Sequence, residues 1–178
     1  MNKVIFAGGC FWCVEHDLRE ANGVISVTSG YSGGDTNNPT YENHKGHREV
    51  VLVEYDSSKT NFKKLAQFFL DHIDPTDSGG QFGDRGSSYK TAIFYNNEEE
   101  KNIALSLLKE LDESRVYDKP NSVEVLEAKN FYKAEEYHQN YAEKNKVHYS
   151  LYRKGSGRED FINRTCAIRE YKHINWKD

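Results

Sequence analysis

The sequence lacks a long apolar segment. Nowhere in its 178 residues does an apolar run approach the roughly 20 residues that a membrane-spanning helix needs. Residues 1–3 lead into a short predicted strand and not into the apolar core of a signal peptide. We therefore expect a cytoplasmic protein that has no membrane partner.

The sequence also lacks a block of charge of one sign. It holds 24 Lys and Arg against 28 Asp and Glu, a formal net charge of −4, and the two signs are interspersed along the chain. Proteins that bind nucleic acid or anionic membranes usually carry a basic patch or stripe. We therefore expect no nucleic-acid partner.

Cysteine is scarce as well. Three cysteines, of which only Cys10 and Cys13 lie close together, do not make the disulfide framework of a small secreted domain. A structural zinc site needs about four ligands, and the chain has no second cluster of cysteines. We expect no metal and no organic cofactor, and a close cysteine pair in a reducing compartment favours catalysis.

Aromatic residues, by contrast, are plentiful. Tyrosine occurs 12 times and phenylalanine 9 times, and aromatic residues make up 13% of the chain. The length is that of one domain, which buries roughly 70% of the surface of its unfolded chain. The aromatic excess is therefore large enough to line a pocket as well as to fill a core.

The pattern of apolar residues predicts an α+β fold. Strands are expected over residues 3–7, 24–31, 49–55, 89–95 and 123–126, and helices over 11–21, 62–73, 97–111 and 134–145. This order favours a two-layer sandwich, in which a mixed sheet has a split β-α-β, ferredoxin-like core. Because the polar residues beyond 153 show no period, we expect a single catalytic domain over 1–153 and an extended C-terminal tail over 154–178.

The close cysteine pair lies where the first predicted strand meets the first predicted helix, in Gly8-Gly9-Cys10-Phe11-Trp12-Cys13. A thiolate at a helix N-terminus is stabilised by unpaired backbone N–H groups and by the helix dipole. The two glycines allow a sharp turn and the close approach of a substrate. We therefore predict that Cys10 is the nucleophile and that Cys13, one helical turn further on, can form a disulfide with it.

Two long polar loops, residues 32–46 and 76–88, are rich in glycine. Long loops in a compact domain are usually functional or disordered. With the strands next to them, they contain a set of phenols and carboxylates, namely Tyr31, Tyr41, Glu49, Asp84 and Tyr89. We expect Tyr31 to be structural and the others to join Cys10 in one site.

Short motifs in these segments follow one another in a distinctive order. They are Gly9-Cys10-Phe11-Trp12, Gly30-Tyr31-x-Gly33-Gly34, Asn38-Pro39-Thr40-Tyr41, Gly46-His47-x-Glu49, Tyr55-Asp56, Asp74-Pro75, Gly83-Asp84-Arg85-Gly86-Ser87-x-Tyr89 and Phe131-Tyr132-x-Ala134-Glu135-x-x-His138-Gln139. The series resembles the successive signatures of the A-type peptide methionine sulfoxide reductases. It spans residues 4 to about 153.

The resemblance implies a reaction and a role for each residue of the site. Cys10 is expected to attack the sulfur of methionine S-sulfoxide, free or in peptides, and Glu49 to supply the proton to the departing oxygen. The other implied contacts are hydrogen bonds to that oxygen from Tyr41 and Tyr89, a supporting hydrogen-bond network at Asp84, and a cradle for the substrate methyl made by Phe11 and Trp12.

The chemistry of a sulfoxide agrees with these roles. Its oxygen is a poor leaving group unless it is protonated, so the site needs an acid that stays neutral near pH 7. Burial among aromatic residues raises the pKa of a carboxyl group, and we expect this of Glu49. Attack leaves Cys10 as a sulfenic acid, which condenses readily with a nearby thiol.

The resemblance also implies how the enzyme is regenerated. Many members of the family have glycine at the position of Cys13 and use a distal cysteine, so a cysteine here suggests a local disulfide with Cys10 that thioredoxin reduces. Cys166 is the alternative resolving thiol, although a free thiol in the tail is the simpler expectation. The segment 42–48 is shorter than is usual for the family.

Two other functions fit part of the sequence. A thioredoxin-like dithiol-disulfide oxidoreductase also has C-x-x-C between a strand and a helix, but that function leaves the two glycine-rich loops without a task. A module that binds hydrophobic peptides in an aromatic cleft would not need Cys10.

Overall fold

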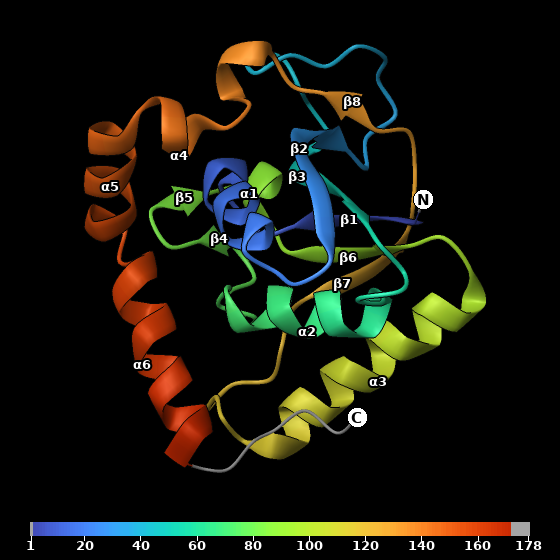
Figure 1. Ribbon diagram of the computed structural model, residues 1–178, viewed down its shortest axis with the longest axis vertical. Coiled ribbons are helices and arrows are strands. Elements are labelled where there is room, and N and C mark those ends of the chain that lie inside the picture. The colour runs from blue at the N-terminus through green and yellow to red at the C-terminus, as the bar shows by residue number, and fades with distance from the viewer. Residues whose placement is uncertain (1, 172–178) are drawn as a thin grey trace.

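A mixed sheet of six strands, in the order β7-β6-β1-β3-β2-β8, forms the centre of the computed structural model (Figure 1). The structure describes residues 2–171, and for residues 169–171 it describes the backbone alone. The strands of this sheet are β1 (Asn2–Ala7), β2 (Val24–Ser32), β3 (Arg48–Tyr55), β6 (Ala92–Tyr95), β7 (Glu124–Glu127) and β8 (Tyr132–Lys133). Neighbouring strands are antiparallel except β6 and β7, which are parallel.

Helices and short elements complete the fold. The helices are α1 (Phe11–Arg19), α2 (Phe62–Asp71), α3 (Glu98–Ser114), α4 (Tyr141–Lys144), α5 (Lys146–Gly155) and α6 (Arg158–Tyr171), and the 3₁₀ turns are η1 (Ser87–Tyr89) and η2 (Glu136–His138). A separate two-stranded hairpin pairs β4 (Gly80–Gln81) with β5 (Asp84–Arg85). The expected α+β class with a mixed sheet is confirmed.

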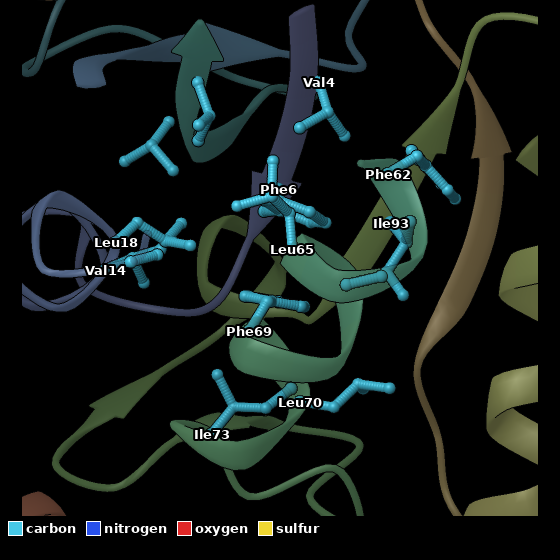
Figure 2. Close-up of a cluster of buried hydrophobic side chains, with 14 of the residues drawn as sticks. Val4, Phe6, Val14, Leu18, Phe62, Leu65, Phe69, Leu70, Ile73 and Ile93 are labelled. Atoms are coloured by element: carbon cyan, nitrogen blue, oxygen red, sulfur yellow. The ribbon is translucent and has the colours of Figure 1, made fainter. Parts of the chain in front are cut away.

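The main core lies between one face of the sheet and the helices α1, α2 and α3. Side chains alternate between the two faces of a strand, and in β1 Val4 and Phe6 enter this core. Figure 2 shows them beside the apolar stripe of α2, where Phe6 stacks on Phe69 with 4.7 Å between ring centroids. The intervening Ile5 faces the opposite side, which the segment joining β7 to β8 covers.

The turn from β1 into α1 requires both of its glycines. Gly9 has a φ of +84°, and a Cβ added there would lie 2.5 Å from Cβ of Gln81. A Cβ on Gly8 would lie 2.8 Å from side-chain atoms of Phe69 and Val14. Only glycine at these positions leaves room for the side chains of Gln81, Phe69 and Val14, which pack against the turn.

The C-terminal segment differs from its expected extended conformation. Helix α5 continues past residue 153, where the domain was expected to end, as far as Gly155. Helix α6 then begins at Arg158, a residue that is 1% exposed. Phe161 of α6 packs edge-on against Phe82. The residues of α6 have no amphipathic period, so contacts with distant parts of the chain hold this helix in place. Residues 172–178 of the expected tail lie outside the described residues.

Two further expectations about local structure were wrong. The helix expected over 134–145 is the short turn η2 followed by α4, because Asn140 between them has a left-handed backbone with φ of 55°. The strand expected from residue 89 begins at Ala92, since residues 87–89 form η1.

Candidate active site

All the predicted site residues except Cys13 line a single cavity of about 130 Å³. The lining residues are Cys10, Phe11, Trp12, Tyr41, Glu49, Asp84, Tyr89 and Tyr152. They come from the start of α1, the loop between β2 and β3, β3 itself, β5, η1 and α5. The fold thus brings together the two glycine-rich loops and the cysteine turn, as the sequence predicted.

The two cysteines of the pair occupy different positions relative to this cavity. Cys10 precedes the first residue of α1 and is 5% exposed, whereas Cys13 is completely buried and does not line the cavity. The N–H of Cys13 donates to the carbonyl oxygen of Cys10 at 3.2 Å, so the residues are one helical turn apart. Both are free thiols, and Cys166 is a free, exposed thiol on α6.

The ionisation of the pair differs from the sequence-based expectation for Cys10. Burial raises the pKa of Cys10 well above its ordinary value, and the hydrogen bond and charge of Cys13 act in the same direction. The first amide of α1, that of Phe11, donates to Glu49 and not to the thiol. The hydrogen bond from Cys10 lowers the pKa of Cys13 to about 7, and the charges of Arg158 and Arg153 also lower it.

Glu49 has the protonation state that the sulfoxide chemistry requires. Its carboxyl is 3% exposed, and Oε2 accepts the Phe11 N–H at 3.0 Å. Burial raises its pKa to about 8, with the charges of Asp84 and Cys13 adding to this effect and the Phe11 hydrogen bond opposing it. A carboxyl with this pKa is mostly neutral at pH 7, so it can donate a proton.

Tyr41 and Tyr89 supply hydroxyl groups to the same cavity. Burial raises the pKa of both, and the charge of Glu49 is the next cause in each case. Both hydroxyls therefore remain protonated at neutral pH and are available as hydrogen-bond donors.

Tyr152 is a lining residue that the sequence analysis missed. Its hydroxyl donates a hydrogen bond to Oδ2 of Asp84, and burial raises its pKa. The available signal was a series of tyrosines, Tyr141, Tyr149 and Tyr152, in a segment for which no role was expected. The contact joins residues that are far apart in the chain, so local patterns do not indicate it.

Trp12 is held rigidly at the edge of the cavity. Its ring stacks on Tyr141 with 3.9 Å between centroids and an interplanar angle of 9°. Its Nε1–H donates to Nδ1 of His138 at 3.0 Å. Phe11 packs against the ring of the same histidine, so His138 supports both aromatic residues of the cavity wall.

Two absences hold for the part of the chain that the structure describes. Across residues 2–171, no three or more His, Cys, Asp or Glu side chains are grouped so that they could hold a metal ion. None of the described helices has both the length and the apolar character needed to cross a membrane.

The chain is similar to known proteins over most of its length. The family model for peptide methionine sulfoxide reductase matches residues 2–170. The peptide methionine sulfoxide reductase MsrA of Bacillus pumilus is 50% identical over 161 residues, which cover 88% of this chain and 90% of that protein. MsrA of Bacillus subtilis is 48% identical over 162 residues, covering 89% of this chain and 92% of that protein.

Solved structures show the same likeness. Methionine sulfoxide reductase A of Corynebacterium diphtheriae matches with a TM-score of 0.70 and 28% identity, over 81% of this chain and 74% of that one. Reduced Mxr1 of Saccharomyces cerevisiae matches with a TM-score of 0.74 and 27% identity, over 82% and 86%. Mxr1 in complex with Trx2 shares the fold, with a TM-score of 0.58 and 22% identity, over 79% and 84%. The chain belongs to the peptide methionine sulfoxide reductase family.

Proposed function

We propose that the protein reduces methionine S-sulfoxide, free or within peptides, to methionine in the cavity at the start of α1. The observation that carries this proposal is the neutral Glu49 carboxyl beside Cys10 in a cavity walled by aromatic residues. A nucleophilic sulfur and a proton donor are the two groups that removal of a sulfoxide oxygen requires.

The reaction begins with attack of the Cys10 sulfur on the sulfoxide sulfur. Glu49 gives its proton to the sulfoxide oxygen, and Tyr41 and Tyr89 donate hydrogen bonds to it. The sulfur–oxygen bond of the substrate breaks and the oxygen moves to the Cys10 sulfur, while the sulfur–sulfur bond formed in the attack also breaks. Cys10 is left as a sulfenic acid, and methionine departs. The proton that Cys10 loses replaces the one that Glu49 gave, so the step is balanced.

The other residues of the cavity orient the substrate. Phe11 and Trp12 form the apolar wall against which the substrate methyl packs. Asp84 lies in the same cavity and accepts the hydrogen bond from Tyr152, and this pair holds the polar side of the cavity in place.

Regeneration takes place through Cys13. Its sulfur attacks the Cys10 sulfenic acid, water leaves, and a disulfide forms between the two residues. Thioredoxin then supplies the two electrons that reopen this disulfide, so the cycle needs no metal and no organic cofactor. Mxr1 has the same fold as this chain, and its complex with Trx2 is consistent with such a partner.

The proposal extends to the finer points of architecture and location. The order β6-β1-β3-β2, with α1 and α2 as connections, supports a two-layer sandwich with a split β-α-β, ferredoxin-like core. Residues 1–153 are proposed as the single catalytic domain, onto which α6 packs. A cytoplasmic location accords with a pair of cysteines that must be reduced to act.

An assay with both sulfoxide epimers tests the function. With dithiothreitol in excess, we expect the protein to convert dabsylated methionine S-sulfoxide to the thioether, measured by liquid chromatography, and to leave the R epimer unchanged. The protein should not accelerate the reduction of insulin disulfides above the rate with dithiothreitol alone. Accelerated insulin reduction without loss of sulfoxide would instead favour the thioredoxin-like dithiol-disulfide oxidoreductase, and conversion of neither epimer would refute the proposal.

Replacing Cys13 by serine separates the reduction of the substrate from the regeneration of the enzyme. We expect Cys13→Ser to release one methionine per enzyme and then to stall when thioredoxin is the reductant, because no local disulfide forms. Quantifying methionine in a single turnover and in the thioredoxin-coupled assay tests this. Full coupled activity would show that Cys13 is not the resolving thiol, and the loss of coupled activity in Cys166→Ser would assign that role to Cys166.

A further inference from the structure

Cys13 lies in a buried polar environment that the C-terminal helices provide. Tyr149 of α5 is 5% exposed and shares a buried cluster with Cys10 and Cys13. A hydrogen bond from its hydroxyl is one of the effects that lower the pKa of Cys13. No substrate-facing role in the proposed reaction uses these contacts, because Cys13 does not line the cavity.

The hydroxyl of Tyr149 is oriented so that it donates to Cys13. Arg153 donates to the Tyr149 oxygen at 2.9 Å, and a guanidinium has donors only. The hydroxyl oxygen is therefore the acceptor in that contact, and its hydrogen is free for the sulfur. Asp17, which lies 3.0 Å from Arg153, holds the guanidinium in place, and both side chains are mostly buried.

Arg158 adds a second cation on the same side. It donates to the carbonyl oxygen of Gly8 at 2.9 Å and to that of His72 at 3.3 Å, and it lies over the ring of Phe82. Within residues 2–168, no carboxylate forms an ion pair with it. Its charge is therefore not neutralised locally, and this charge lowers the pKa of Cys13.

The two sulfurs of a Cys10–Cys13 disulfide would thus differ in two ways. Cys10 lines the cavity and is 5% exposed, whereas Cys13 is fully buried and does not line the cavity. A thiolate formed at Cys13 receives a hydrogen bond from Tyr149 and the field of two arginines. In thiol–disulfide exchange, the sulfur that forms the more stable thiolate is the better leaving group.

We propose that the reductant attacks the disulfide at Cys10, and that Cys13 leaves as a thiolate stabilised by Tyr149, Arg153 and Arg158. This inference rests on the proposed function, since it assumes the Cys10–Cys13 disulfide. The reductant thiolate forms a bond with the Cys10 sulfur, the Cys10–Cys13 bond breaks, and its electron pair remains on Cys13. The second thiol of the reductant then attacks its own partner sulfur and releases Cys10, so the dithiol supplies both electrons.

Trapping the mixed disulfide tests where the attack occurs. Enzyme oxidised by one turnover with methionine sulfoxide is mixed with a thioredoxin in which the second cysteine of its C-x-x-C motif is serine. After acid quenching and alkylation, tandem mass spectrometry locates the linkage, because fragmentation between Phe11 and Trp12 separates the two cysteines. We expect thioredoxin on Cys10 and the alkyl group on Cys13, and thioredoxin on Cys13 would overturn the inference.

A second measurement tests the role of the tyrosine hydroxyl. Tyr149→Phe should slow the reduction of the oxidised enzyme by thioredoxin by about 10-fold, the effect of losing one hydrogen bond to a charged group. In a Cys10→Ser, Cys166→Ser background, the same change should move the thiolate absorbance of Cys13 to higher pH, which loss of packing alone would not do. An unchanged reduction rate and titration would contradict the role of Tyr149.

Tyr132→Phe is the matched control. Tyr132 lies on β8, and the substitution removes a hydroxyl that donates a hydrogen bond to Oδ1 of Asn37. It should change neither the reduction rate nor the titration. Methionine release is measured first on every preparation. Failure of the proposed function appears there as an absence of methionine, whereas a linkage on Cys13 after normal methionine release overturns only the present inference.

Discussion

Replacing Cys10 by serine is expected to abolish sulfoxide reduction. The oxygen of serine is a far weaker nucleophile than a thiolate and does not accept the transferred oxygen as a sulfenic acid does. Loss of the nucleophile in an enzyme with a covalent intermediate lowers turnover by on the order of 10⁶-fold. Dabsylated methionine formed in a single turnover with excess dithiothreitol measures the effect directly.

Cys166→Ser is the matched control for this experiment. Cys166 is exposed on α6, does not line the cavity and is a free thiol like Cys10. Its replacement should leave the dithiothreitol-driven activity unchanged. Binding of methionine-containing peptides with equal affinity by wild type and Cys10→Ser, without turnover by either, would contradict the proposed function and favour a peptide-binding module.

Local sequence patterns predicted the part of the molecule that is built from short-range contacts. The strand-turn-helix start of the chain, the apolar stripe of α2 and the cap of α3 all follow from residues close in sequence. At α3, the side chain of Asn97 accepts the N–H of Glu100 at 2.9 Å and so caps the start of the helix. The family motifs indicated in addition that the two glycine-rich loops and the cysteine turn contribute to one site.

The residues that α5 and α6 contribute to the site were not predictable in the same way. Tyr152, Tyr149 and Arg158 act through contacts with residues far away in the chain, and no local pattern distinguishes them from surface residues. Between residues 158 and 168, few side chains of α6 are buried, and one of these is an arginine, so the helix lacks an amphipathic period. A buried charge is uncommon and requires partners, which the sequence alone does not identify.

The difference between local patterns and long-range contacts also explains the ionisation of the two cysteines. A helix start predicts a stabilised thiolate at Cys10, and this holds when the first amides are free. Here the Phe11 amide is used by Glu49, and burial raises the pKa of Cys10. The hydrogen bond from Cys10 lowers the pKa of Cys13 most, and Arg158, Arg153 and Tyr149 of α5 and α6 lower it further. Distant residues therefore contribute to which thiol ionises first.

Glu49→Gln is expected to slow the release of methionine in a single turnover by about 10² to 10⁴-fold at pH 7, the usual contribution of a general acid. Glutamine has nearly the same shape, and its oxygen can still accept the Phe11 N–H, so the cavity should keep its geometry. What the variant lacks is the proton that the sulfoxide oxygen requires.

The pH dependence of the rate distinguishes loss of the Glu49 proton from damage to the structure of the cavity. Glu49 has a pKa of about 8 in the folded protein, against an ordinary value of 4.5, so it is protonated below pH 8 and ionised above it. The wild-type rate should therefore fall as the pH rises through about 8, and Glu49→Gln should lack this decrease. Single-turnover rates measured across this range decide the point.

The thermal stability of Glu49→Gln is the control for damage to the fold. The direction in which Glu49 changes stability with pH follows from its raised pKa. Between pH 4.5 and about 8 the folded protein keeps a proton that the unfolded chain has lost. The contribution of Glu49 to stability is therefore present below pH 4.5 and is lost as the pH rises toward 8. Glu49→Gln has no such loss, so at pH 8 it should unfold at a temperature no lower than that of wild type. A slow variant that is also less stable at this pH would point to a damaged fold, whereas a fast one would exclude Glu49 as the acid.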